Sequence, residues 1–227
     1  MMDFSILKAL TIPEGDVKRI DIDGVTKWEF SPRDLYQRVE YIYRKASGGW
    51  FRTDFLADNQ SGLELSYSVP SFSDTATMGS RNSSVTNGRC YIFYPRAATV
   101  GYIGWNSAQS WSVSTEANTQ YITRLNWLNS RKAVILNADG STKATKSISG
   151  TLVQHTSPID ICTYAGSSGR AMSLYGARLS QGSEVVREYI PCYRKSDGEI
   201  GLYETFSGQF LPSRVSGGFT KGEDIDW

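Results

Sequence analysis

The stretch "VVREYIPCYRKSDGEIGLYETFSGQF", residues 185–210, decides the fold. Its runs of β-forming residues, separated by two turn signals, predict three short strands that follow one another antiparallel. The sequence Ser196-Asp197-Gly198 predicts a tight reversal, because glycine supplies the positive φ that such turns need. Pro191 has no N–H to donate, which predicts a sheet edge or a bulge, and Cys192 is expected to be a small buried residue. These features describe a closing hairpin that requires no chemistry.

The rest of the chain from Leu35 onward repeats this pattern. Short strand-like runs such as "GLELSYSV", "RCYIFYP", "QYITRLNWL" and "AMSLYGARLS" are each bounded by Gly, Asn, Asp or Ser. None of them has the 3.6-residue period of an amphipathic helix. Many short strands with regular turn signals predict an all-β sandwich or barrel.

The segment 168–210 resembles the end of concanavalin A-like (laminin-G-like) jelly-roll domains, which many phage and prophage structural proteins carry. The resemblance extends over roughly residues 35–220, and Glu204 departs from it, since the family has aspartate there. It implies a sandwich of two antiparallel sheets in a virion protein. The matching positions are Ala171, Leu174, Tyr175, Val186, Ile190, Pro191, Cys192, Lys195, Asp197, Gly198, Gly201, Leu202, Tyr203 and Phe210.

Residues 1–33 are predicted to form a separate N-terminal unit, followed by the jelly-roll domain at 34–227. The sequence "VKRIDIDGVTKWEF" places Asp-Gly between two alternating runs, which is a strong hairpin signal. A two-stranded hairpin is marginal alone and must pack on something. It is therefore either a docking arm or an edge hairpin of the same core, and similar hairpin segments precede such domains in phage tail and virion proteins. The candidate docking residues are Val17, Ile20, Ile22 and Trp28.

Charge and cysteine usage exclude several classes of partner. With 24 basic and 23 acidic residues, the net charge of +1 gives no general attraction to nucleic acid or to an anionic membrane. The N-terminal residues lack the pattern of a secretory signal, and no segment is apolar enough to be inserted in a membrane. The three cysteines are far apart, which favours a reducing compartment over a disulfide framework. Together with the resemblance, this predicts a virion protein assembled in the host cytoplasm and released by lysis.

Catalytic groups are scarce in this sequence, and no catalytic residue is predicted. The single histidine, His155, lies in a turn-like run without a nucleophile motif nearby, so a satisfied or exposed loop histidine is expected. A glycoside hydrolase would need two carboxylates on one face of a strand. The nearest pairs lie in "RIDIDG" and in the tail "GEDIDW", outside the expected central strands. No metal-ligand set is predicted and no cofactor is required, although the oxygen-rich loops 57–62 and 137–142 leave calcium open.

Aromatic residues are the strongest indication of binding. The chain has six tryptophans and 13 tyrosines, and "GYIGWNSAQSW" groups several of them with amide side chains. An apolar platform with a few oriented polar groups is typical of a carbohydrate site. Alternatively the tryptophans belong to the core between facing sheets, and Trp111 is the better candidate for exposure because serines flank it. The candidate carbohydrate-binding residues are Tyr102, Trp105, Asn106, Gln109 and Trp111.

The sequence therefore predicts a non-enzymatic phage virion structural protein, such as a tail, baseplate or head decoration, that binds host surface glycans. Its expected partners are other virion proteins, bacterial surface glycans and further copies of itself. A purely structural subunit is the alternative. A glycoside hydrolase is the third hypothesis, and it requires carboxylates from different strands to converge.

Overall fold

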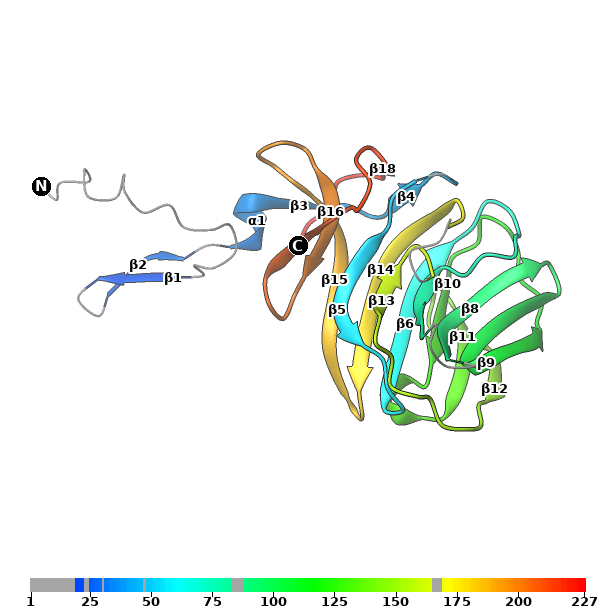
Figure 1. Ribbon diagram of the computed structural model, residues 1–227. Helices are drawn as coiled ribbons and strands as arrows, with labels where there is room; N and C mark the ends of the chain where they lie inside the picture. Colours follow the sequence, from blue (N-terminus) through cyan, green and yellow to red (C-terminus); the bar gives the residue numbers. More distant parts are fainter. Residues whose placement is uncertain (1–18, 23–24, 30, 47, 83–87, 165–168) are drawn as a thin grey trace, which may run out of the picture.

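The computed structural model describes residues 19–22, 25–29, 31–46, 48–82, 88–164 and 169–227. Two antiparallel sheets pack face to face as a β-sandwich, which confirms the predicted all-β jelly-roll architecture (Figure 1).

Three cysteines, Cys90, Cys162 and Cys192, are free and buried. Burial raises the pKa of each thiol to about 12.

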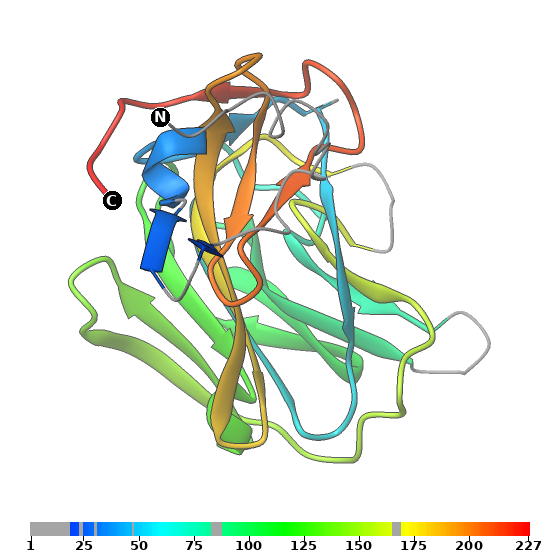
Figure 2. The same ribbon diagram turned by 90° about the vertical axis from the view of Figure 1, so that its left-hand side faces the viewer.

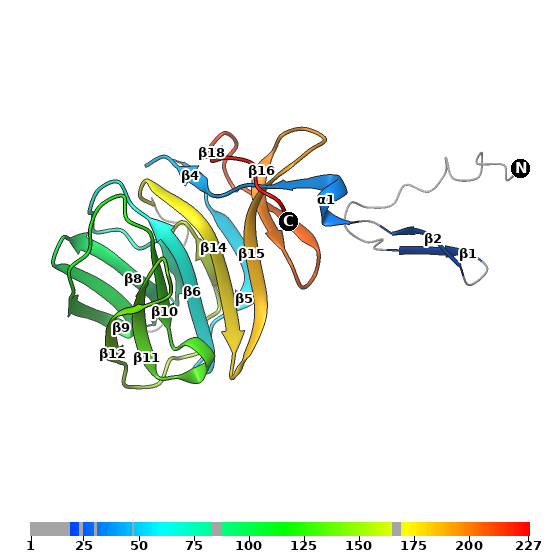
Figure 3. The ribbon, with the colours of Figure 1, turned by 180° about the vertical axis from the view of Figure 1, so that it is seen from behind.

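The larger sheet has the strand order β12-β11-β10-β6-β14-β15-β16-β17. Figure 3 shows β10, β6, β14 and β15 side by side in it. Its strands are β6 (Ser61–Ser68), β10 (Tyr121–Leu125), β11 (Lys132–Asn137), β12 (Thr142–Ser147), β14 (Met172–Gln181), β15 (Glu184–Arg194), β16 (Ile200–Glu204) and β17 (Gln209–Pro212), with β3 (Tyr36–Arg38) paired to β15, and β4 (Ile42–Arg44) paired to β14 and to β18 (Phe219–Lys221).

The smaller sheet has the order β5-β13-β7-β8-β9. Its strands are β5 (Phe51–Leu56), β13 (Pro158–Ile161), β7 (Met78–Arg81), β8 (Arg89–Ala97) and β9 (Val100–Ser112). Figure 2, turned by 90°, shows β17 (red-orange) of the larger sheet between β16 (orange) and β5 (cyan).

The main core lies between the two sheets. In strands such as β10, every second side chain points into it. Along β10, Tyr121, Thr123 and Leu125 are buried, whereas Ile122 and Arg124 are half-exposed. Successive side chains of a strand point to opposite faces, so every second residue reaches the core. On the smaller sheet, Tyr91 and Tyr94 of β8 belong to a separate cluster outside this core, where the site described below lies.

The closing hairpin has the predicted turn, with Gly198 at φ 74°. Cys192 is fully buried, as predicted. The prediction for Pro191 was wrong, because β15 has neighbours on both sides and is not an edge strand. Pro191 stands where β15 passes from its pairing with β14, at residues up to Tyr189, to its pairing with β3 from Cys192 onward. Its missing N–H falls between these two ladders, where neither pairs with it.

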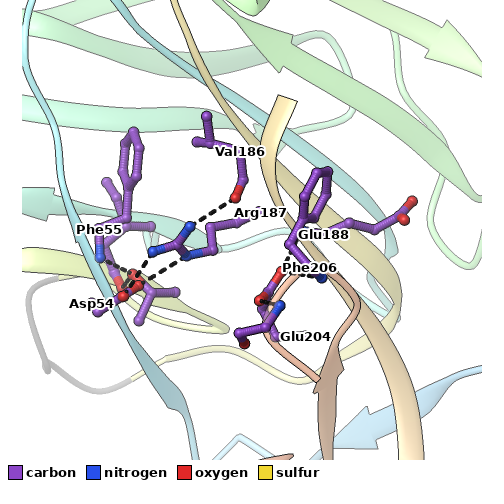
Figure 4. Close-up of polar contacts among 10 residues, drawn as sticks. Asp54, Phe55, Val186, Arg187, Glu188, Glu204 and Phe206 are labelled. Atoms are coloured by element: carbon purple, nitrogen blue, oxygen red, sulfur yellow. Dashed lines mark hydrogen bonds and ion pairs between the residues drawn. The ribbon is translucent and has the colours of Figure 1, made fainter. Parts of the chain in front are cut away.

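Glu204 lies near the end of the stretch 185–210, and its side chain holds the turn that follows it (Figure 4). Its side chain is buried, and its carboxylate accepts backbone N–H groups from Phe206 (3.1 Å), Ser207 (2.7 Å) and Glu188 (3.2 Å). Burial alone would raise the pKa of this carboxyl group, but the hydrogen bonds from Ser207 and its neighbours hold the pKa below its ordinary value. Glu204 therefore fixes the turn between β16 and β17, which is a structural role.

Beside this turn, an ion pair joins the two sheets (Figure 4). Arg187 of β15 donates to Asp54 of β5, with Nη2 2.9 Å from Oδ2 and Nε 3.2 Å from Oδ1. The pair holds the pKa of Asp54 below its ordinary value, chiefly through the side-chain hydrogen bonds from Arg187. Both residues are partly exposed to solvent, so the pair contributes little to stability.

The predicted N-terminal hairpin is confirmed in its backbone. Strands β1 (Arg19–Ile22) and β2 (Val25–Glu29) pair antiparallel, with Ile20 opposite Trp28 and Ile22 opposite Val25. They form a two-stranded sheet of their own, outside both sheets of the sandwich (Figure 1). Val17 and the Asp-Gly turn lie outside the described residues, and the domain boundary at 33/34 stays a prediction.

A single-turn helix, α1 (Pro32–Leu35), leads from the hairpin into β3. Ser31 and Asp34 form a capping box, in which the Asp34 carboxylate accepts the backbone N–H of Ser31 at 3.1 Å. Among the described residues, no helix has the length and apolar character needed to cross a membrane.

Candidate functional site

A hollow lined by tyrosines opens on the outer face of the smaller sheet. It has a volume of about 260 Å³. Its aromatic side chains form a cluster that is separate from the main core. The lining residues are Asp74, Thr75, Ala76, Arg81, Arg89, Tyr91, Tyr94 and Tyr164.

A β-bulge in β8 brings two of these tyrosines to the same face. Tyr91 pairs with Gly104 of β9 and Tyr94 pairs with Tyr102, so three steps on β8 oppose two on β9. Without the bulge, residues three apart would point to opposite faces. Gly104 is needed here, because a Cβ at this position would lie 2.4 Å from the ring of Tyr91. The ring of Tyr91 therefore packs directly on Gly104 of β9.

The four tyrosine rings pack on one another. The rings of Tyr94 and Tyr102 are stacked, with centroids 6.0 Å apart and planes 24° apart. Tyr164, which follows β13, meets Tyr91 edge to face at 5.1 Å. Aromatic pairs of this kind add stabilisation beyond the area they bury. The hollow thus has walls that are already in place without a ligand.

One carboxylate and one guanidinium fix the rim of the hollow. Tyr94 donates its hydroxyl to Asp74 at 2.9 Å, and the Nη1 of Arg96 donates to the hydroxyl of Tyr102 at 3.1 Å. The Nε of Arg96 also lies 3.6 Å from Asp74. These contacts hold the loop before β7 against β8 and β9.

The phenol groups stay protonated at neutral pH. Burial raises the pKa of Tyr91 to about 12, although the nearby Arg89 opposes the rise. Burial also raises the pKa of Tyr94, and its hydrogen bond to Asp74 raises it further. Burial raises the pKa of Tyr164, against the charges of Arg89 and Arg81. Each hydroxyl is therefore able to donate as well as accept a hydrogen bond.

Two of the residues expected to bind carbohydrate are core residues instead. Trp105 is 1 % exposed and donates its indole N–H to the carbonyl of Gly150 at 3.2 Å. Trp111 is 8 % exposed and meets Phe93 edge to face at 5.6 Å. Both belong to the cluster between the sheets, so neither has a free ring face for a sugar. The structure corrects the prediction for these two residues, because inward alternation prevails over their polar neighbours in sequence.

The other three candidates have different positions. Tyr102 belongs to the tyrosine cluster, and Asn106 lies directly opposite Arg89. Asn106 has φ 64°, and its Oδ1 is buried without a hydrogen-bond partner in the described part of the chain. Gln109 is half-buried on the part of β9 beyond its pairing with β8. Neither Tyr102 nor Asn106 lines the hollow itself, but both border it, since Tyr102 stacks on Tyr94 and Asn106 pairs with Arg89.

The sequence analysis missed Tyr91, Tyr94 and Tyr164 as site residues. In "RCYIFYP" two apolar residues separate the two tyrosines, and only an anticipated bulge would have placed both on the outer face. Tyr164 comes from a distant segment and is brought there by the pairing of β13 with β7.

His155 is buried, and its imidazole ring contacts a serine hydroxyl. Its Nδ1 lies 2.5 Å from the hydroxyl of Ser80, and burial lowers its pKa. It was expected to be either exposed in a loop or satisfied, and it is hydrogen-bonded on one side. The other ring nitrogen has no partner among the described residues.

The two loops considered for calcium use their carboxylates to fix turns. Asp139 accepts the backbone N–H and the hydroxyl of Ser141 at 2.9 and 2.7 Å. Asp58 accepts from Ser61 at 3.0 Å and from Gln181 at 2.9 Å. Within the described ranges, no three His, Cys, Asp or Glu side chains gather as a metal site would require.

Comparison with known proteins adds little to this geometry. No protein-family model and no curated protein matches the chain. A solved structure that resembles it is a presumed carbohydrate-binding protein from Bacteroides ovatus, with a TM-score of 0.47 and 12% identity over 85% of this chain. The match covers 62% of that protein, so this chain spans less than two thirds of its length. A likeness this distant carries no information about the ligand, and the function has to be argued from the site.

Proposed function

We propose that this chain is a non-enzymatic virion protein whose sandwich binds host surface glycans in the tyrosine hollow. The observation that carries the proposal is the hollow itself, in which tyrosine rings are combined with oriented polar groups. Sugars present apolar C–H faces and hydroxyl groups together, and sites for them need both kinds of partner. The virion setting rests on the resemblance of residues 35–220 to concanavalin A-like domains of phage structural proteins.

The polar groups of the hollow suit binding better than hydrolysis. Asp74 is the one carboxylate among the described residues that line it, and a glycoside hydrolase needs two. Asp74 also accepts a hydrogen bond from Tyr94 and lies near Arg96. It is therefore placed to position hydroxyl groups of a ligand rather than to exchange protons in a reaction.

Replacing Tyr164 with alanine is expected to weaken glycan binding about tenfold or more while leaving the sandwich folded. Tyr164 is half-buried at the edge of the cluster, and losing one stacking aromatic removes about 1–3 kcal/mol of contact energy. Binding to a glycan array and to bacterial cells would be measured together with the melting temperature.

The matched control is Tyr175→Ala. Tyr175 is also half-buried and packs on Tyr41 at 5.6 Å, on the larger sheet. It should leave glycan binding unchanged. Equal loss in both variants would contradict the hollow as the binding site, and absence of glycan binding by the unaltered protein would favour the purely structural subunit.

The N-terminal hairpin is proposed to dock the protein on other virion components. Its two strands pair with each other and with no strand of the sandwich. The backbone register puts Ile20 opposite Trp28. An apolar cross-strand pair on a small separate sheet favours packing against a partner.

Deleting residues 1–30 is expected to abolish incorporation into particles while the sandwich keeps its circular dichroism spectrum and its melting temperature. Sedimentation of particles from a host that produces the truncated chain would show whether the protein is present. The full chain with Trp28→Ala is the finer variant, expected to incorporate less. Normal incorporation of the truncated chain would contradict the docking role.

A further inference from the structure

Two arginines stand directly opposite each other at the hollow. Arg81 of β7 pairs in register with Arg89 of β8, and both line the hollow. Arg81 is exposed and Arg89 is half-buried. Like charges at directly opposite positions of neighbouring strands are destabilising. The stability of the fold therefore does not explain why two arginines occupy these positions.

Neither arginine is compensated by an acid among the residues that the structure describes. In the part of the chain that the structure describes, no carboxylate forms an ion pair with Arg81 or Arg89. The sequence between them, residues 82–88, contains no acidic residue, and neither does the segment 165–168 that follows Tyr164. The acid of the hollow, Asp74, is engaged by Tyr94 and Arg96 instead.

We infer that the hollow takes an anionic saccharide, whose carboxylate or phosphate group binds between Arg81 and Arg89. The inference rests on the proposed function and names the class of glycan for it. Guanidinium groups bind carboxylates and phosphates through paired N–H donors, and two of them facing one hollow form a strong anion site.

The neighbouring groups fit this arrangement. Both arginines line the same hollow as Tyr164, which belongs to the aromatic wall on which a sugar ring would pack. Asn106, in register with Arg89, has a buried Oδ1 without a partner among the described residues. Counting Arg96 with the two lining arginines, three cations accompany one carboxylate at this hollow, whereas the whole chain carries a net charge of only +1.

The test compares matched probes that differ only in charge. One pair is oligogalacturonate and its methyl ester, and the other is a sugar-phosphate polymer and its dephosphorylated form. Binding to the full chain would be measured by calorimetry at low and high salt. At least one anionic probe should bind at least tenfold more tightly than its neutral counterpart, and salt should weaken that binding. The pair that shows the difference identifies carboxylate or phosphate as the recognised group.

The double variant Arg81→Gln/Arg89→Gln should lose this preference at least tenfold. Its melting temperature should stay equal or rise, because the repulsion between the two charges is removed. The control is Arg214→Gln, which removes an exposed arginine far along the chain and should leave binding unchanged. Equal binding of charged and neutral probes, sensitive to Tyr164→Ala, would overturn the anionic class and leave glycan binding standing. Failure of every saccharide on a broad array to bind would overturn the proposed function, and the inference with it.

Discussion

Replacing Trp105 with alanine is expected to lower the free energy of unfolding by about 3–5 kcal/mol, the range for large aromatic residues in a core. Trp105 is 1 % exposed, and no larger side chain is so fully buried. Its ring packs in the main core, and its indole N–H satisfies the carbonyl of Gly150. The substitution leaves both a cavity and an unpaired acceptor, and chemical denaturation monitored by fluorescence would measure the loss.

Alanine substitutions at two other aromatic residues of β9 allow the loss of stability to be compared within one strand. Trp111→Ala should also cost several kcal/mol, because Trp111 lies in the same core against Phe93. Tyr102→Ala should cost less, since Tyr102 is half-buried on the outer face. A Trp111→Ala protein that keeps its stability but loses glycan binding would restore the interpretation of Trp111 as an exposed sugar platform.

The fold was predictable because its signals are local. Alternation along strands such as 121–125 and the Asp197-Gly198 turn act over a few residues, and the structure confirms both. The position of Pro191 was not predictable in this way, since it depends on which strands flank β15. Neighbours of a strand are set by pairing across the whole chain, and one short stretch does not specify them.

The hollow was less predictable than the fold for a related reason. Its residues come from the loop before β7, from β7 and β8, and from the segment after β13. The bulge that turns Tyr91 and Tyr94 to one face changes the period that sequence reading relies on. The aromatic-rich run 102–111 was predicted to bind carbohydrate, but Trp105 and Trp111 are core residues. Most of its large rings serve the core, because a strand with period two sends alternate residues inward.

Replacing Arg170 is also expected to have a large effect on stability, and this residue links the core to the hollow. It is 4 % exposed, and its Nη1 donates to the carbonyl of Pro95 at 2.9 Å. Its Nη2 donates to the carbonyl of Ser71, and Nη1 also reaches the carbonyl of Ser73 at 3.5 Å. Burial lowers the pKa of this guanidinium, whose partners are carbonyl oxygens. Arg170 thereby holds the loop that carries Asp74 against β8.

Replacing Arg170 with methionine keeps most of the side-chain volume and removes every donor. The variant should lose about 2–5 kcal/mol of unfolding free energy, because the carbonyl of buried Pro95 and those of Ser71 and Ser73 lose their donor. Arg214→Met, at an exposed position, should change stability by less than about 0.5 kcal/mol.

Arg170→Lys separates the two roles of Arg170, since one ammonium group cannot reproduce the spread of guanidinium donors. Below its melting temperature this variant should bind glycan more weakly than the unaltered protein, because the loop around Asp74 is held less firmly. Unchanged affinity in a less stable Arg170→Lys protein would show that Arg170 supports the sandwich alone. Reduced affinity with Asp74 and the tyrosines intact would show that the shape of the hollow depends on this buried charge.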